Sequence, residues 1–233
     1  MRKPRLLDLF CGAGGCAKGY ADAGFEVIGV DNRPQKNYPY EFHLADALEF
    51  LDTADLSSFS AIHASPPCPR YTSITALSGN RNKHPDLVAI VRKKLQMTGK
   101  PYVIENVTGA PFEQGVMLCG SMFDLRIRRH RCFESNLLIM APGPCRHHGE
   151  IMSIHGAHTR DYSGKVLVIN ENWQQSRKWR PINVPKERGM EAMGITWAMT
   201  QDELSNAIPP AYTKWIGRQL LEYLRMDREA VAV

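Results

Sequence analysis

The residues best suited to chemistry in this chain are a cysteine and a glutamate that each follow a short apolar run. Cys68 comes directly after Pro66 and Pro67, whose restricted backbone would hold its thiol rigidly in a loop. A rigid thiol near cationic side chains has a lowered pKa and can act as a nucleophile. Glu105 ends another run, and a carboxyl group beside such a thiol could donate a proton to a substrate. Taken singly, Cys68 would fit a buried structural cysteine better, but the two residues together favour catalysis.

A glycine-rich turn and two acids indicate a second kind of site. The turn Gly12-Ala13-Gly14-Gly15 follows an apolar run and opens a helical one, so its backbone N–H groups could approach a ligand closely. Asp31 ends the next run, where a carboxylate suits a bidentate hydrogen bond to ribose hydroxyls. Asp46 could accept from an adenine amine in the same way. A tight turn flanked by surface acids remains the alternative.

The positive charge is concentrated in one stretch. Arg126–Glu191 holds 12 Lys or Arg and 6 Asp or Glu. The net charge of this stretch is therefore +6, which exceeds the net charge of +5 of the whole chain. Such asymmetry favours a polyanionic partner, although a solvated basic face fits as well. Within the stretch two tryptophans alternate with three cations, a composition that suits contacts to phosphates and bases or, alternatively, an exposed loop. The three cations are Arg177, Lys178 and Arg180.

Soft metal ligands also gather in the basic stretch. Cys145, His147, His148, His155 and His158 fall within 14 residues. Sulfur and imidazole can bind zinc. The segment has no CxxC pair, however, and its HxxH spacing is short for a zinc finger. We therefore expect histidines that are solvated or contact the polyanionic partner, and no metal site.

Alternating strands and helices must position these residues. The apolar patterns predict strands at Arg5–Phe10, Phe25–Val30, Ser60–Ala64 and Tyr102–Glu105, and helices at Cys16–Ala23, His84–Gln96, Glu187–Met193, Gln201–Asn206 and Ala211–Met226. This order is typical of an α/β fold with a Rossmann-like, doubly wound sheet. Because the candidate residues end strands, they should meet at the carboxyl edge of the sheet.

Composition excludes several classes of protein. Apolar residues make up 43% and charged residues 23%, as in globular proteins. No apolar run approaches the ~20 residues of a membrane span. The apolar stretch Leu6–Cys11 contains Asp8 and is too short for an export signal. The six cysteines should therefore be reduced, and we expect a cytoplasmic protein without disulfides.

Five motifs in order resemble those of the DNA (cytosine-5)-methyltransferase family, particularly its compact phage-type members. Asp8–Gly15 (DLFCGAGG) resembles the motif that holds S-adenosylmethionine, and Ser65–Cys68 (SPPC) resembles the motif of the catalytic thiol. The other three are Glu105–Val107 (ENV), which carries the catalytic carboxylate, Arg129-His130-Arg131, which supplies an Arg-x-Arg pair, and Asn206–Pro209 (NAIP), which folds back against the first motif.

The resemblance implies roles for individual residues. Cys68 would attack C6 of cytosine, Glu105 would hold or protonate N3, Arg131 would hold the ring oxygen, and Arg129 would orient Glu105. S-adenosylmethionine would donate the methyl group, and the base would flip out of double-stranded DNA. The residues implied in cofactor binding are Phe10, Gly12, Gly14, Asp31, Asp46, Pro67 and Asn206.

The sequence departs from the family pattern at three places. Pro69 and Ile127 stand where the family has glutamine, and Asn32 stands where an aromatic residue often stacks on adenine. The resemblance also divides the chain into a catalytic and cofactor-binding core at 1–140, a small target-recognition subdomain at 141–190, and a segment at 191–233 that returns to the core. Because the recognition region is short, a long target site is disfavoured.

Two other functions remain possible from the sequence. A family branch modifies tRNA, but its Cys-Phe-Thr signature is absent here. A catalytically silent DNA-binding relative is disfavoured because both Cys68 and Glu105 are present. The enzyme is expected to act as a monomer without an obligate protein partner or a membrane, in the setting of restriction-modification or phage infection.

Overall fold

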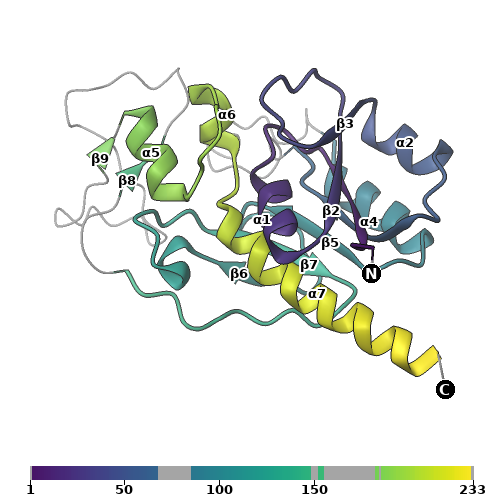
Figure 1. Ribbon diagram of the computed structural model, residues 1–233. Coiled ribbons are helices and arrows are strands. Elements are labelled where there is room, and N and C mark those ends of the chain that lie inside the picture. The colour runs from purple at the N-terminus through teal and green to yellow at the C-terminus, as the bar shows by residue number, and fades with distance from the viewer. Residues whose placement is uncertain (1, 68–84, 148–151, 155–181, 184, 232–233) are drawn as a thin grey trace.

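The computed structural model describes residues 2–67, 85–147, 152–154, 182–183 and 185–231, and a seven-stranded sheet lies at its centre (Figure 1). The strands are β1 (Arg5–Leu9), β2 (Glu26–Asp31), β3 (Glu41–Leu44), β4 (Phe59–Ala64), β5 (Tyr102–Asn106), β6 (Val116–Leu118) and β7 (Arg131–Ser135). Their order is β3-β2-β1-β4-β5-β7-β6. The strands from β3 to β5 pair in parallel, and β7 runs antiparallel to both of its neighbours. This mainly parallel sheet has the Rossmann-like arrangement that the order of the predicted elements indicates.

Helices cover both faces of the sheet. Helices α1 (Gly15–Ala23) and α7 (Pro210–Val231) lie on one face, and α2 (Ala47–Thr53) and α4 (Leu87–Met97) lie on the other (Figure 1). Alternation along β1 divides the core accordingly, because neighbouring side chains of a strand point to opposite faces. Leu6 packs with the α1 and α7 side chains, whereas Leu7 and Leu9 pack with those of α2 and α4.

The last helix packs closely on the first. A Cβ atom at Gly19 would lie only 2.1 Å from Thr213 Oγ1 and 2.2 Å from the Pro210 carbonyl oxygen, so a side chain at Gly19 has no room. Thr213 Oγ1 donates a hydrogen bond of 2.8 Å to the Cys16 carbonyl oxygen. The close approach brings the C-terminal segment back to the glycine-rich turn, as expected from its motif.

Smaller elements form one end of the molecule. They are η3 (Gly120–Phe123), β8 (Met152–Ser153), β9 (Ile182–Asn183), α5 (Lys186–Met193) and α6 (Gln201–Asn206). β8 and β9 make a separate two-stranded parallel sheet. In Figure 1 this pair lies beside α5, away from α2 and α4. Most of the expected recognition subdomain lies outside the described residues, so its boundaries stay predictions.

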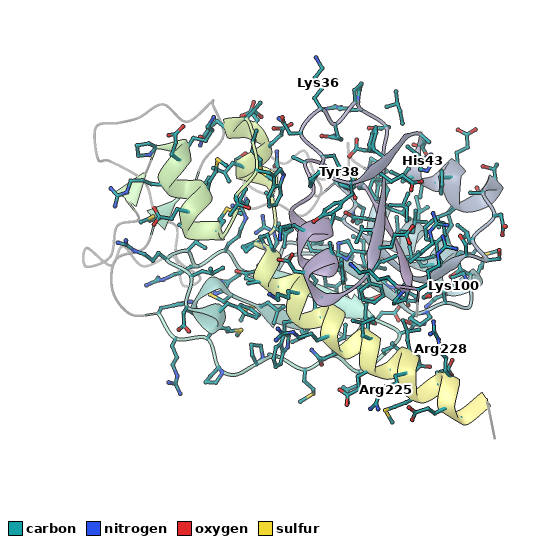
Figure 2. All side chains as sticks on the ribbon, in the orientation of Figure 1. Lys36, Tyr38, His43, Lys100, Arg225 and Arg228 are labelled. Carbon is teal, nitrogen blue, oxygen red and sulfur yellow. The ribbon has the colours of Figure 1, made fainter. Side chains whose placement is uncertain are left out.

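A buried ion pair ties α4 to β7. Arg92 Nε and Nη2 donate to the two carboxylate oxygens of Glu134 at 2.5 and 2.8 Å. Arg92 Nη2 also donates to the Pro111 carbonyl oxygen at 2.8 Å. The exposed cations Lys36, Arg225 and Arg228 point outward in Figure 2. Apolar side chains and this one bidentate pair therefore hold α4 against the sheet.

The predicted elements agree with the observed ones in order and nearly in bounds. Strand β1 ends one residue earlier than expected, and α7 extends from Pro210 to Val231. The apolar run Leu137–Met140 forms no helix or strand. Within the described part of the chain, no helix is both long and apolar enough to cross a membrane.

Candidate active site

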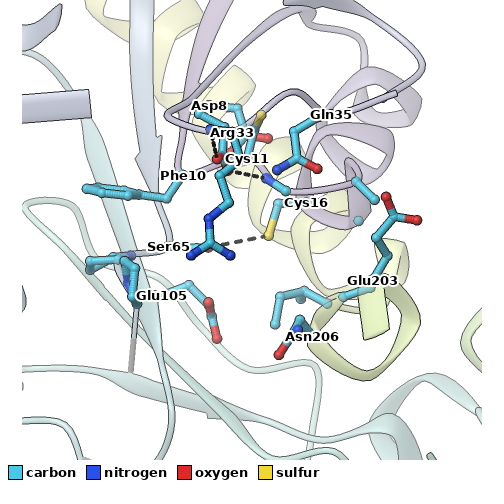
Figure 3. A pocket seen from close by; sticks show the side chains of 18 of the residues that line it. Asp8, Phe10, Cys11, Cys16, Arg33, Gln35, Ser65, Glu105, Glu203 and Asn206 are labelled. Atoms are coloured by element: carbon cyan, nitrogen blue, oxygen red, sulfur yellow. Dashed lines mark hydrogen bonds between the residues drawn. The ribbon is translucent and has the colours of Figure 1, made fainter. Parts of the chain in front are cut away.

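A cavity of about 750 Å³ opens at the carboxyl ends of β1, β2, β4 and β5. It is lined by residues of the glycine-rich turn, of the three strand ends that follow, and of α6 with the residues after it. Figure 3 shows Phe10, Ser65 and Glu105 on one side of the opening and Glu203 and Asn206 on the other. All five sequence motifs thus converge on one space, since Arg131 lines it too, together with the strand end that carries Asp31.

The glycine-rich turn is locked to the end of β2. Gly12 N donates to Asp31 Oδ2 at 3.1 Å, and Arg33 N donates to Asp31 Oδ1 at 3.0 Å. Gly12 has φ +50°, a left-handed conformation that glycine adopts without strain. Phe10 and Gly12 both line the cavity, as does Asp31. Each oxygen of Asp31 keeps a lone pair for a further donor, so the carboxylate can still bind a ligand.

Gly14 is held in place by close packing. It is not among the residues that line the cavity. A Cβ atom at Gly14 would lie 2.8 Å from Pro39 Cδ and 3.1 Å from the Tyr38 ring. Its φ of +89° also excludes most side chains. Packing and the turn therefore require glycine here, and contact of Gly14 with the cofactor stays a prediction.

Asp46 lines the cavity while capping a helix. It is the N-cap of α2, where its Oδ1 accepts from Leu48 N at 2.9 Å and from Glu49 N at 3.1 Å. An N-cap carboxylate is held in place by these bonds. The second oxygen of Asp46 can accept a donor from the cavity.

Asp8 is a site residue that the sequence reasoning missed. Its side chain is fully buried, and neither carboxylate oxygen has a hydrogen-bond partner among the described residues. Burial, reinforced by Asp31 and Glu105, raises its pKa well above the ordinary value. Because it lies at the inner wall of the cavity, Asp8 fits a ligand that brings a cationic or hydrogen-bond-donating group. The available signal in the sequence was a single carboxylate among the leucines of β1.

Glu105 is buried at the end of β5 and faces a cation. Its Oε1 lies 3.2 Å from Arg131 Nε, and only 8% of its side chain is exposed. Burial raises the pKa of Glu105 above its ordinary value. Three interactions oppose that rise: the charge of Arg131, a hydrogen bond with Ser65, and the charge of Arg129. A carboxyl group in these surroundings holds a proton more readily than a solvated one, which suits a proton donor.

The structure assigns the two arginines differently from the expectation. Arg131 makes the ion pair with Glu105, although Arg129 was expected to orient that carboxylate. Arg129 instead donates from Nη2 to the Ser205 carbonyl oxygen, at the end of α6. Burial, together with Arg131, lowers the pKa of Arg129 to about 9. Arg129 therefore joins the Arg-x-Arg loop to the C-terminal motif, and acts on Glu105 only through its charge.

The turn that precedes Cys68 is held beside Glu105. Asn106 Nδ2 donates to the Pro66 carbonyl oxygen at 2.9 Å, which joins the end of β5 to the end of β4. Pro66 and Pro67 line the cavity. Cys68 itself lies outside the described residues, as do Arg177, Lys178 and Arg180. The structure thus places the residues on the N-terminal side of Cys68, and the position of its thiol stays a prediction.

A buried polar chain supports this turn from behind. His63 Nδ1 lies 2.9 Å from the Tyr20 hydroxyl, and His63 Nε2 lies 2.9 Å from Ser65 Oγ. Burial lowers the pKa of His63 to about 3, so the ring is neutral. A neutral ring relays one hydrogen bond on each nitrogen and fixes Ser65 beside Glu105. In the sequence His63 is a single polar residue in an apolar strand, a pattern that does not distinguish it from a structural histidine.

The C-terminal segment forms the opposite wall. Asn206 lines the cavity, and its Nδ2 donates to the Asp202 carbonyl oxygen at 2.9 Å. Glu203 Oε2 accepts from Asn37 Nδ2 at 2.8 Å, which joins α6 to the loop after β2. Trp197 Nε1 donates to the Ala13 carbonyl oxygen at 2.9 Å. These contacts close the cavity against the glycine-rich turn, as expected for the last motif.

Two cysteines of the cavity wall are poor nucleophiles. Cys11 and Cys16 both line the cavity and are buried. Burial raises the pKa of each thiol, and Asp8 raises it further. Both therefore stay protonated near neutral pH, and a thiol nucleophile at this site must come from elsewhere in the chain.

Known proteins are similar to this chain in sequence and in fold. Residues 4–111 match the family model described as C-5 cytosine-specific DNA methylase. The chain is 33% identical over 119 residues to the Type II methyltransferase M.HgiGI of Herpetosiphon aurantiacus, a match that covers 46% of this chain and 92% of that protein.

Two solved structures share the fold over nearly their whole length. A putative DNA modification methyltransferase encoded within a prophage of E. coli has a TM-score of 0.58 at 14% identity and covers 95% of this chain and 99% of its own. The Dnmt2 methyltransferase of S. pombe has a TM-score of 0.54 at 14% identity and covers 96% and 99%.

Proposed function

This chain belongs to the C-5 cytosine-specific DNA methylase family, and we propose that it works through a covalent bond between Cys68 and carbon 6 of the target base. It transfers a methyl group from S-adenosylmethionine to carbon 5 of cytosine in DNA. The proposal rests mainly on Glu105, a buried carboxyl group paired with Arg131 in the cavity that Pro67 also lines. Cys68, the next residue after Pro67, would enter the same space.

Carbon 5 of cytosine is a poor nucleophile and must be activated. Attack of the Cys68 thiolate on C6 forms a carbon–sulfur bond and moves the electrons of the 5,6 double bond toward C5. Glu105 donates its proton or a hydrogen bond to N3 and so stabilises the charge that develops in the ring. Once C5 carries the methyl group, it loses its proton to solvent, and the Cys68 thiolate leaves as the double bond returns.

The raised pKa of Glu105 supports its role as the acid. Burial keeps a proton on this carboxyl group at higher pH than in water. The guanidinium of Arg131, 3.2 Å away, orients the carboxyl group. Arg131 is also proposed to hold the carbonyl oxygen O2 of the base. Arg129 supports the loop through the Ser205 carbonyl oxygen.

The cavity fits S-adenosylmethionine on the chemistry of its donors and acceptors. The cofactor supplies a methyl group that its sulfonium makes electrophilic. The buried, unpartnered carboxylate of Asp8 suits the cationic amino group of the cofactor, and Asp31 suits its ribose hydroxyls. Asp46 suits an adenine amine, and Phe10 offers an apolar surface at the same wall.

DNA binding is proposed for the basic stretch. Chemistry on C5 and C6 requires the base to flip out of the duplex, because both faces of the ring must be reached. Arg177, Lys178 and Arg180 are proposed to contact phosphates of the duplex. The name of the type II methyltransferase relative supports a role in restriction-modification.

A trapping experiment tests the covalent step. DNA with 5-fluorocytosine at the target should form a stable adduct on Cys68, because fluorine cannot leave as a proton does. Cys68→Ser should lose both the adduct and methyl transfer while it still binds S-adenosylmethionine, since a hydroxyl is far less ionised than a thiol. Cys132→Ser, a half-buried thiol on β7, is the matched control and should keep the adduct. No adduct on a confirmed target would overturn the covalent step.

A salt titration tests the DNA contacts. Lys178→Ala with Arg180→Ala should weaken binding to all sequences and flatten the salt dependence by about two phosphate contacts. A changed sequence preference with an unchanged slope would instead assign these residues to base contacts. Parallel assays with tRNA check that DNA is the substrate.

A further inference from the structure

Two cysteines and two histidines meet outside the cavity, at the end of the molecule that holds η3. Their ligand atoms all lie within 4.8 Å of one another, although the residues come from three separate segments of the chain. We propose that this cluster holds a structural zinc ion in a Cys2His2 site. Its members are Cys119, His130, Cys145 and His147.

The distances in the cluster suit one tetrahedral ion. Cys119 Sγ lies 3.4 Å from His147 Nε2, His130 Nε2 lies 3.4 Å from Cys145 Sγ, and the two Nε2 atoms are 3.2 Å apart. Zinc with bonds of about 2.3 Å to sulfur and about 2.0–2.1 Å to nitrogen sets such ligands roughly 3.3–3.6 Å apart. Cys145 Sγ and His147 Nε2, at 2.7 Å, must move apart, which rotation of these side chains allows because both are near the surface.

The kinds of ligand favour zinc over harder cations. Two thiolates and two neutral imidazoles neutralise a divalent ion, and sulfur and nitrogen ligands select zinc over magnesium or calcium. The cluster holds no carboxylate. Four protein ligands leave no open position, so the site would stabilise the fold and not catalyse a reaction.

A serine completes the surroundings of the two sulfur atoms. Ser121 Oγ lies 3.3 Å from Cys119 Sγ, to which it donates, and 3.5 Å from Cys145 Sγ. Arg146 N donates to the same hydroxyl at 3.1 Å. Hydroxyl and amide donors of this kind orient and stabilise metal-bound thiolates. The competing arrangement is a metal-free one, in which the Cys119 thiol donates to the Arg128 carbonyl oxygen at 2.9 Å.

The position of His130 links the proposed metal site to the catalytic residues. His130 stands between Arg129 and Arg131, so a bond from its ring to a metal would anchor the loop that presents Arg131 to Glu105. Of the other ligands, Cys119 directly precedes η3, and Cys145 and His147 lie at the start of the expected recognition subdomain. One ion would therefore join the catalytic sheet to the start of the region expected to contact DNA.

Metal analysis of the full-length protein tests the proposal. Protein purified without chelator should contain about one zinc ion per chain, and Cys145→Ala should lower that content at least about tenfold. Cys132→Ala is the matched control, because this thiol lies on β7 outside the cluster, and should keep the metal. Cobalt exchanged into the wild-type site should give intense visible bands of a tetrahedral ion and a near-ultraviolet thiolate-to-cobalt band.

Two further measurements keep the test decisive if a variant fails to fold. An organomercurial added to the wild-type protein should release zinc to a chromophoric indicator as thiols react. Removal of the metal from the wild type should lower its Tm, and zinc should restore it. Folded wild-type protein without zinc and without the cobalt bands would overturn the proposal in favour of the hydrogen-bonded cluster, as would full metal content in Cys145→Ala.

Discussion

The ion pair between Arg131 and Glu105 makes a sharp prediction about the pH dependence of methyl transfer. Burial raises the pKa of Glu105, and the nearby guanidinium limits that rise. Arg131→Met removes the cation but keeps a side chain of similar length, so the pKa of Glu105 must rise further. If protonated Glu105 is the required acid, activity is lost as pH rises through this pKa. The alkaline limb of the profile therefore moves to higher pH in the variant.

The size of the shift follows from the geometry. At the 3.2 Å between Arg131 Nε and Glu105 Oε1, a charge pair with an effective dielectric constant near 20 interacts by roughly 5 kcal/mol, which is an upper bound. Water reaches the pair, since 20% of the Arg131 side chain is exposed, and weakens the interaction. An opposite charge at this range typically shifts a carboxyl pKa by about 1–3 units, so we expect about 1–2 units.

The assay is the pH profile of kcat/KM, which reports groups of the free enzyme. The variant will be slower at every pH because Arg131 is also expected to contact the base, but the position of the alkaline limb does not depend on that loss. Arg131→Lys keeps a cation and should shift the limb less. Arg126→Met removes an exposed cation from the same segment and should not shift it, because Arg126 is not among the groups that act on Glu105. An unmoved limb in Arg131→Met, or a limb at lower pH, would refute the assignment of Glu105 as the acid.

Three other changes have defined outcomes. Asp31→Ala should weaken S-adenosylmethionine binding by about 10- to 100-fold in calorimetry, because a charge-assisted acceptor is worth about 1–3 kcal/mol; an unchanged Kd would remove Asp31 from the cofactor site. Gly19→Ala should lower the free energy of unfolding in urea by about 1–3 kcal/mol, since the added Cβ would lie 2.1 Å from Thr213 Oγ1. Arg92→Met and Glu134→Leu should each cost about 3–5 kcal/mol, whereas the double variant should recover most of the loss; additive losses would show that the pair is not what holds α4.

The fold was predictable where apolar periodicity is strong. Strands β1, β2, β4 and β5 and helices α1 and α7 were expected nearly within their observed bounds, whereas the four-residue β3 was not predicted. The pairing of β6 and β7 was not predicted either, because β6 has three residues and η3 separates it from β7. A short strand carries little pattern, and its direction is set by partners that only the folded chain provides.

The sequence predicted the site residues that lie at strand ends. It predicted less well the residues whose roles depend on contacts between distant parts of the chain. Asp31 and Glu105 were expected at the sheet edge and lie there. Asp8 was missed because the sequence does not show what surrounds an acid inside an apolar strand. Its role follows only from its place at the wall of the cavity. The partner of Glu105 was assigned to Arg129, since two arginines separated by one residue in the sequence give no clue to which one faces the carboxylate. Arg131 lies in β7, two residues before Phe133, which pairs with Glu105, so its side chain points to the same face of the sheet as Glu105.

The metal ligands show a limit of reading spacing along one segment. Cys145 and His147 were considered together with three later histidines, which lie outside the described residues. The other two members of the observed cluster are Cys119 and His130. Ligands that far apart in the sequence follow no short motif, and only the pairing of β6 with β7 brings them together.

The contact between α1 and α7 also sets the order of events when the protein is made. The hydrogen bond from Thr213 to the Cys16 carbonyl oxygen spans 197 positions of the chain. At a synthesis rate of about 5–20 residues per second, the glycine-rich turn waits roughly 10–40 s on the ribosome before its partner exists. During that interval one face of the sheet has α1 but lacks α7, and the cavity wall formed by α6 is missing. The nascent chain should therefore be unable to bind the methyl donor. It should gain this ability late and abruptly, once α6 and α7 have been synthesised.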